Sequence, residues 1–179
     1  QMGIRPESSH HEAGPGQNEI DFRYSDALTA ADQTMLFRTI TKIVSYRNGL
    51  SADFTPKPLP VEPGNCFHIN ISIQPDETFS NLGHVIGGIL EKIREMTVFF
   101  NFTENSYQRF GNNKAPMYIS WAGENRSQLI RIPATFGEYR RAELRSPDPL
   151  ANPYLSFALL IYAGLYGLQN NSELPAAAD

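Results

Sequence analysis

The spacing of apolar and polar residues predicts short strands separated by longer helices. Residues 66–73 have the clearest strand pattern, because apolar and polar side chains alternate along the whole segment. One face of this strand is apolar, and the other presents His68, Asn70 and Ser72. Similar but shorter runs predict further strands at residues 19–23, 51–55, 117–122, 129–133 and 140–145.

Apolar residues at helical spacing predict a first helix that begins at Asp26 or Thr29, either of which can cap it, and ends near residue 46. Its predicted buried stripe comprises Met35, Leu36, Ile40, Ile43 and Val44. A last helix begins after Asn152, which is a cap followed by proline. This helix is apolar nearly all round, which indicates burial.

The middle helix is predicted over residues 79–100. Its predicted buried positions are Leu82, Val85, Ile86, Ile89, Leu90 and Ile93. The pair Gly87-Gly88 weakens a helix, so its presence predicts close packing against a neighbouring element.

Strands in hairpin-like succession with intervening helices predict the α+β class, with an antiparallel β-sheet and helices packed on one side. We expect residues 1–170 to form part of one domain and residues 171–179 to be a disordered tail.

Composition narrows the function classes. A net charge of −4 provides no basic surface for nucleic acid or an anionic membrane, and no apolar run is long enough to span a bilayer. The single cysteine, Cys66, excludes an internal disulfide and is typical of a reducing cytoplasm. We therefore expect a cytoplasmic protein with no nucleic-acid or membrane partner.

Residues 10–24 concentrate polar chemistry around a Gly-Pro-Gly bend. The bend can fold Glu12 back beside Glu19, and two carboxylates placed so closely favour a bound divalent cation. The alternative is a polar loop whose charges are simply solvated.

A second group of candidates lies on the later strands. Arg141, Glu143 and Arg145 share one face by their two-residue period. They form either a salt-bridged surface row, or a metal-binding glutamate between arginines that hold phosphate or carboxylate oxygens. His68 is likewise either a hydrogen-bonded core histidine or a ligand. Glutamates, a histidine and several arginines together favour phosphoryl transfer over metal-dependent hydrolysis.

Four segments then match one family in order along the chain. They are HHEAGPGQNEI at residues 10–20, KPLPVEPGNCFH at 57–68, NRSQLIRIP at 125–133, and RAELRSPDPLANPY at 141–154. This pattern resembles the catalytic domain of the bacterial-type glutamine synthetases, of which the chain would be an incomplete, C-terminal part.

The resemblance implies roles for particular residues. The implied metal ligands, for Mg²⁺ or Mn²⁺, are Glu12, Glu19, His68 and Glu143. The implied ATP-binding residues are Asn70, Ser72, Arg126, Arg131 and Arg141, of which Arg126 and Arg141 would act in catalysis on the transferred phosphoryl group. The implied glutamate-binding residues are Gly64, Arg109 and Arg145.

The implied activity is an ATP-dependent ligase that forms glutamine from glutamate and ammonia through a γ-glutamyl phosphate, in nitrogen assimilation. The family also implies a homo-oligomer.

Three departures from the family pattern leave alternatives open. Pro63 and Cys66 change the loop before His68, and Lys114 stands where the family carries a flap glutamate. The family's N-terminal domain and paired-glutamate strand are also missing. The alternatives are a γ-glutamyl ligase for another amine, or a non-catalytic relative that still binds nucleotide or metal.

Overall fold

A computed structural model describes residues 3–73, 80–134 and 140–178. The elements along the chain are β1 (Pro6–His11), β2 (Asn18–Phe22), α1 (Ala27–Arg47), β3 (Ile69–Ile71), α2 (Ser80–Phe100), α3 (Glu104–Tyr107), β4 (Trp121–Ala122), β5 (Ile130–Arg131), β6 (Ala142–Leu144) and α4 (Pro153–Asn170). The predicted start of the middle helix, Phe79, lies outside the described residues.

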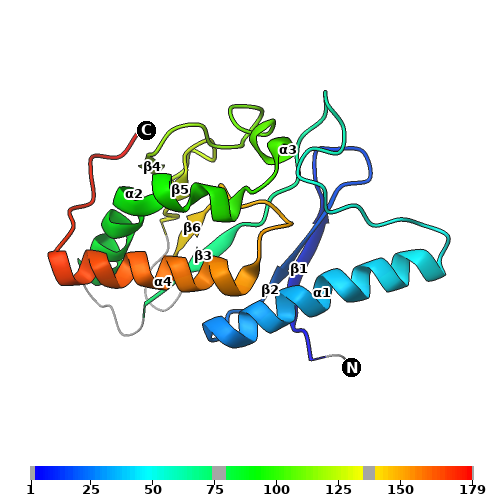
Figure 1. The fold of residues 1–179 in the computed structure, drawn as a ribbon, viewed down its shortest axis with the longest axis horizontal. Helices are drawn as coiled ribbons and strands as arrows, with labels where there is room; N and C mark the ends of the chain where they lie inside the picture. Colours follow the sequence, from blue (N-terminus) through cyan, green and yellow to red (C-terminus); the bar gives the residue numbers. More distant parts are fainter. Residues whose placement is uncertain (1–2, 74–79, 135–139, 179) are drawn as a thin grey trace.

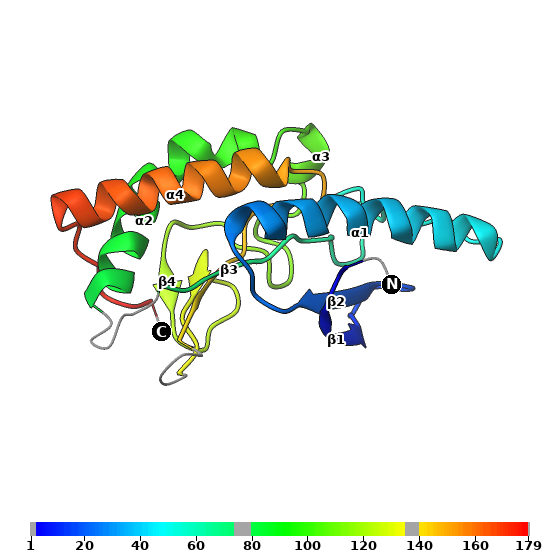
Figure 2. The same cartoon turned by 90° about the horizontal axis from the view of Figure 1, so that it is seen from below.

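The strands and helices form two layers, which confirms the α+β prediction. A four-stranded sheet has the order β3-β6-β5-β4, and β1 and β2 form a separate antiparallel hairpin. Helices α2 and α4 lie side by side over one face of the sheet, and α1 covers the hairpin (Figures 1 and 2). The sheet differs from the predicted antiparallel sheet in one pair of strands, because β4 and β5 run parallel. The amides of Ile130 and Ile132 donate to the carbonyl oxygens of residue 120 and Ala122, so the connecting segment returns to the start of β4 before β5 begins.

The core lies between α2, α4 and the sheet. All six apolar positions predicted for α2 are buried, and they pack with Ile130 and Leu144 of the sheet. The predicted close packing at Gly88 is confirmed, because a Cβ there would lie 2.4 Å from the carbonyl oxygen of Ala163 on α4. At Gly167 the corresponding distance to the His84 carbonyl oxygen is 2.1 Å. The α2–α4 backbones therefore touch at a crossing that only glycine permits.

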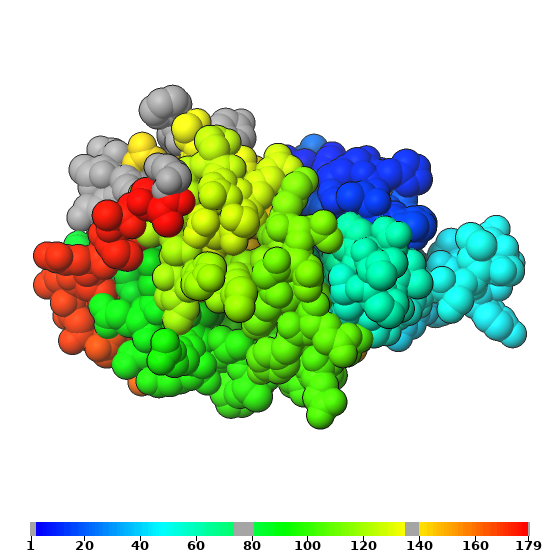
Figure 3. Space-filling view, turned by 90° about the horizontal axis from the view of Figure 1, so that it is seen from above, coloured from blue at the N-terminus to red at the C-terminus, as the bar shows by residue number. Residues whose placement is uncertain are grey.

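The buried stripe predicted for helix α1 is largely exposed. Asp26 caps the helix as expected, but Met35, Leu36, Ile43 and Val44 are between 38% and 50% exposed rather than buried. The buried residues are Ala31 and Thr34, because α4 touches α1 only near its N-terminal half. The hairpin touches α1 through Phe22 and Phe37, whose ring centroids are 5.1 Å apart. The C-terminal end of α1 projects beyond the rest of the molecule, as Figure 3 shows in cyan.

Several predicted strands are shorter or absent. Residues 51–55 form no strand, and both backbone groups of Thr55 bond to side chains, its amide to Asp53 and its carbonyl oxygen to Asn65. Of the strand predicted at residues 66–73, only β3 pairs with a neighbouring strand, and of the strand predicted at residues 117–122, only β4 does. Strand β1 was not predicted, because every one of its side chains is exposed and its sequence has no apolar alternation.

The end of the chain lies along the sheet. Residues 171–178, which the sequence predicts to be a disordered tail, have no regular secondary structure. Trp121 donates its indole N–H to the Pro175 carbonyl oxygen at 2.7 Å, and the Ala178 amide donates to the Trp121 carbonyl oxygen at 2.8 Å. These bonds fix the tail along the β4 edge of the sheet.

Helix α4 is only partly buried, contrary to the prediction. Its Leu160 and Ala163 face the core, whereas Ile161, Tyr162 and Leu165 are at least half exposed. One face packs against α2, and no described element covers the opposite face. Within the described residues, no helix is both long and apolar enough to cross a membrane.

Candidate metal and phosphate site

The β1–β2 hairpin brings the predicted carboxylates together. His10 and Glu19 are direct cross-strand partners, and the bend between the strands closes through a bond from the Glu12 amide to the Gln17 carbonyl oxygen at 2.9 Å. Gly16 has a φ of +67° in this bend, a conformation that glycine adopts without strain. Glu12 thus folds back beside Glu19, as the sequence of the bend predicts.

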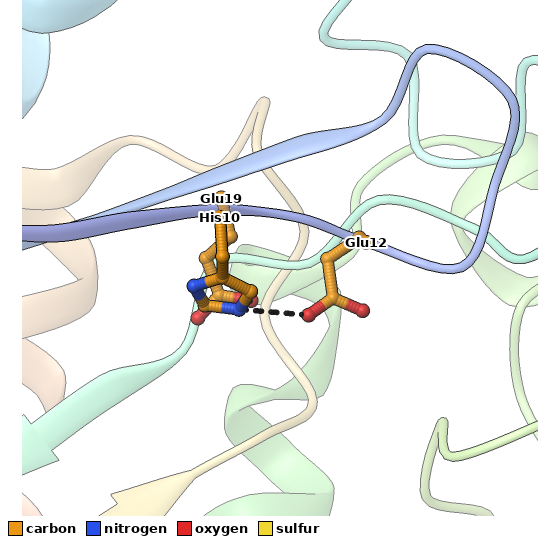
Figure 4. A group of neighbouring side chains, drawn as sticks. All are labelled: His10, Glu12 and Glu19. Atoms are coloured by element: carbon orange, nitrogen blue, oxygen red, sulfur yellow. Dashed lines mark hydrogen bonds and ion pairs between the residues drawn. The ribbon is translucent and has the colours of Figure 1, made fainter.

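Three side chains converge on one side of the hairpin, as Figure 4 shows. His10 Nε2 lies 3.0 Å from Glu12 Oε1 and 3.7 Å from Glu19 Oε2. One ligand atom from each residue lies within 4.8 Å of the others. His10 was not among the predicted site residues. The signal that could have found it is the register, because a hairpin closed by the Gly-Pro-Gly bend pairs residue 10 with residue 19.

The proximity of the two carboxylates changes their protonation. Burial, and then the charges of Asp21 and Glu12, raise the pKa of Glu19 to about 7. Burial also acts to raise the pKa of Glu12, but hydrogen bonds from His10 and from the Ala13 amide outweigh it and lower that pKa. This is the pattern of two carboxylates that compete for one proton or share one cation.

Glu143 is the centre of a second cluster, on the sheet. It pairs across the strands with Asn70 of β3 on one side and Arg131 of β5 on the other. Its carboxylate lies 3.1 Å from His68 Nδ1 and 3.4 Å from Arg131 Nη1, and it also accepts a bond from Arg145 Nη1. Glu143 is thus ion-paired and lies beside the candidate ligand His68, and its role in metal binding stays a prediction.

The environment of His68 leaves one ring nitrogen available. Burial, and then the charges of Arg145 and Arg109, lower the pKa of His68 to about 3, so the ring is neutral. Since the Glu143 carboxylate can only accept, Nδ1 carries the proton and Nε2 holds a lone pair. Nε2 is buried and has no hydrogen-bond partner among the described residues. A carboxylate that orients a histidine whose other nitrogen is unpaired is a common arrangement at metal sites.

The hairpin carboxylates are near enough to His68 that the charges of Glu12 and Asp21 act to raise its pKa, against the larger effect of burial. Carboxylate oxygens and neutral imidazole nitrogens are suitable ligands for Mg²⁺ and Mn²⁺. The donors present, with the unpaired His68 Nε2 among them, therefore fit the divalent cations that the resemblance implies.

The predicted glutamate-binding residues Gly64 and Arg109 belong to a network that is bonded to the hairpin bend. Gln17 Nε2 donates to the Gly64 carbonyl oxygen at 3.0 Å and to Asn65 Oδ1 at 2.9 Å, which ties the hairpin to this loop. A Cβ at Gly64 would lie 2.7 Å from Arg109 Cγ. Arg109 is 1% exposed and donates to the Asn65 carbonyl oxygen and to acceptors on two other segments. Both of its Nη groups are thus engaged by the protein.

The other predicted arginines divide into two kinds. Arg145 is buried and donates to the Arg126 carbonyl oxygen as well as to Glu143. Arg126 and Arg141 are exposed, and within the described part of the chain neither guanidinium is paired with a carboxylate. Asn70 and Ser72 are also exposed on the polar side of the β3 segment. Lys114 is exposed in a turn closed by the Gly111 and Ala115 backbones.

A family model described as the catalytic domain of glutamine synthetase matches residues 1–179, the whole chain. The chain belongs to this family. It is 45% identical to a glutamine synthetase of Methanosarcina mazei, over 96% of this chain and 41% of that protein. It is 47% identical to one of Pyrococcus furiosus, over 96% of this chain and 42% of that protein.

A solved structure shares the fold of this chain. A structure described as "GmaS/ADP complex-Conformation 1" matches 99% of this chain and 45% of its own chain, with a TM-score of 0.89 and 32% sequence identity. The α+β fold described above is thus the fold of a glutamine synthetase-like protein. The chain spans about two-fifths of the length of the curated relatives it matches.

The raised pKa of Glu19 predicts a pH-dependent stability in the metal-free protein. The folded pKa of about 7 exceeds the usual value of 4.5, so the folded state binds more protons than the unfolded chain between these values. The stability that this group contributes is present below about pH 4.5 and is lost as the pH rises through about 7. We expect Glu19→Gln to raise the unfolding temperature more at pH 8 than at pH 5, measured in the presence of a chelator.

The control for this prediction is Glu7→Gln, which removes an exposed carboxylate from the same hairpin. Its effect on the unfolding temperature should be small at both pH values. An effect of Glu19→Gln that is equal at pH 5 and pH 8 would contradict the prediction.

Proposed function

We propose that the full-length protein is an ATP-dependent ligase that joins ammonia to the γ-carboxylate of glutamate, with Mg²⁺ or Mn²⁺ as cofactor. The observation that carries this proposal is the row of Asn70, Glu143 and Arg131 across three strands, beside a hairpin with three further metal-binding side chains. Membership of the glutamine synthetase family supports the same reaction class. A homo-oligomer in the cytoplasm is part of this proposal.

Each group of residues has a task in the proposed reaction. Glu12, Glu19 and His68 would hold divalent cations, with Glu143 as a further ligand or as the group that orients His68. The bound cations would offset the repulsion between the ATP phosphates and the carboxylate. The exposed Arg126 and Arg141, with Arg131, would hold phosphate oxygens, and Asn70 and Ser72 would line the approach of the nucleotide.

The proposed reaction has two covalent steps. A γ-carboxylate oxygen of glutamate attacks the terminal phosphorus of ATP, and ADP leaves with its bridging oxygen. Ammonia then attacks the carbonyl carbon of the acyl phosphate, inorganic phosphate leaves with the bridging oxygen, and the proton that the nitrogen loses goes to the phosphate. Gly64, Arg109 and Arg145 would place glutamate for the first step; the bonds of Arg109 to the residue 65 carbonyl suggest that it does so by fixing the loop.

A different amine acceptor is the first alternative. The second step needs a neutral amine, and a cation at Lys114 would repel ammonium and could not take its proton. Pro63 also stiffens the loop beside the proposed glutamate position. A non-catalytic relative that binds nucleotide or metal is the second alternative.

The test is phosphate release by the full-length protein with ATP, Mg²⁺ or Mn²⁺ and glutamate, first with ammonia and then with a panel of primary amines. Release with ammonia supports the proposed reaction, and release only with another amine supports the first alternative. Metal-dependent ATP binding without any release would favour the non-catalytic relative. Residues 1–179 alone serve as the inactive control, because the family's remaining metal ligands lie outside them; turnover by this piece would contradict the assignment of the site.

A further inference from the structure

We propose that His10 is an additional metal ligand, which binds the same cation as Glu12 and Glu19 through its Nε2 atom. The inference rests on the proposed metal-dependent function of this hairpin and adds a nitrogen donor to what the family resemblance implies. It follows from the placement of His10 on β1, directly across from Glu19 on β2.

The distances suit shared coordination. Two ligand atoms bound at right angles, each about 2.1 Å from a cation, lie about 3 Å apart. His10 Nε2 and Glu12 Oε1 are 3.0 Å apart, and Glu19 Oε2 is 3.7 Å from the same nitrogen. The three side chains leave the hairpin on the same side (Figure 4). A small rotation of the Glu19 carboxylate would complete the arrangement.

The hydrogen-bonding capacity of His10 also favours a cation. A neutral imidazole can donate from Nε2 to only one carboxylate at a time, yet two carboxylates approach this atom. A divalent cation at the centre would satisfy both carboxylates and the nitrogen together. The competing interpretation is that His10 forms a surface ion pair with Glu12 and takes no part in metal binding.

The neighbouring histidine provides a matched control. His11 is also exposed on β1, but successive side chains of a strand point to opposite faces, so it lies on the side away from Glu12 and Glu19. His10 and His11 are therefore the same residue type on the same strand, and they differ only in the face of the hairpin that they occupy.

The experiment is Mn²⁺ binding to the full-length protein without substrates, followed by the electron paramagnetic resonance signal of free Mn²⁺. Wild type, His10→Gln and His11→Gln are compared, and thermal unfolding in chelator checks that each is folded. We expect His10→Gln to weaken one Mn²⁺ site by about tenfold or more, and His11→Gln to leave every site unchanged. Pulsed resonance on the bound Mn²⁺ should show a weaker nitrogen coupling in His10→Gln.

The outcomes separate this inference from the proposed ligase activity, because binding is measured without turnover. If wild type binds Mn²⁺ but releases no phosphate, the comparison of variants still decides the role of His10. A folded His10→Gln protein with wild-type Mn²⁺ affinity and nitrogen coupling would overturn the inference. Absence of Mn²⁺ binding to wild type, or equal losses in the two variants, would overturn it as well.

Discussion

Gly88→Ala is expected to lower the stability of the full-length protein by about 3 kcal/mol, because the added methyl group overpacks a backbone contact. Alanine is the better helix former, so propensity alone would raise stability. The new Cβ, however, would lie 2.4 Å from the Ala163 carbonyl oxygen and 2.6 Å from Gly167 Cα. Both are backbone atoms, which cannot rotate away as a side chain can. The helices must therefore move apart, and the α2–α4 core would loosen.

Gly83→Ala is the matched control, since it makes the same change on the same helix. A Cβ at Gly83 would meet no atom within 4 Å, so helix propensity is unopposed and stability should rise by up to about 1 kcal/mol. Thermal unfolding of both variants measures the difference. Equal unfolding temperatures for the two variants would show that the α2–α4 crossing tolerates a methyl group.

The α2 helix and the hairpin bend could be predicted because their signals are local. The apolar period of α2 coincides with its buried face, since that helix packs on α4 and the sheet within this chain. The same reasoning failed for α1, whose predicted apolar stripe is largely exposed here. Periodicity reports that a face is apolar, not what covers it, and the family proteins are more than twice as long as this chain.

The sequence predicts which side chains are candidates for the site, but not how they are connected. The motifs named the carboxylates and His68, but only the strand register shows that Glu143 lies between Asn70 and Arg131. The arginines looked alike in sequence, whereas Arg109 is buried among protein acceptors and Arg126 is exposed. Spacing cannot distinguish these two situations, because they depend on contacts between segments far apart in the chain. The bond between Trp121 and Pro175 beyond α4 is of the same kind, because it joins residues 54 positions apart.

Glu143→Gln is expected to reduce phosphate release by the full-length protein by about 10³-fold, the loss typical of removing one charge-stabilising group from an active site. The amide has nearly the same shape but no charge. Only one of its two terminal atoms, the carbonyl oxygen, can still accept hydrogen bonds, so the variant cannot keep both the bonds of His68 and Arg145 to one carboxylate oxygen and the bond of Arg131 to the other. We therefore expect the network that orients His68 to weaken, and the guanidinium groups of Arg131 and Arg145 to lose their shared counter-charge.

Glu124→Gln separates the role of Glu143 from a general effect on Arg131. Glu124 also pairs with Arg131, at 3.5 Å, but its side chain is 76% exposed, so solvent screens the interaction. Its substitution should change phosphate release less than threefold, a range expected for exposed ion pairs. Comparable losses in the two variants would mean that any carboxylate beside Arg131 suffices, and that the buried link from Glu143 to His68 is dispensable. A large loss confined to Glu143→Gln would instead locate the requirement at the strand that joins the metal ligands to the phosphate-binding arginines.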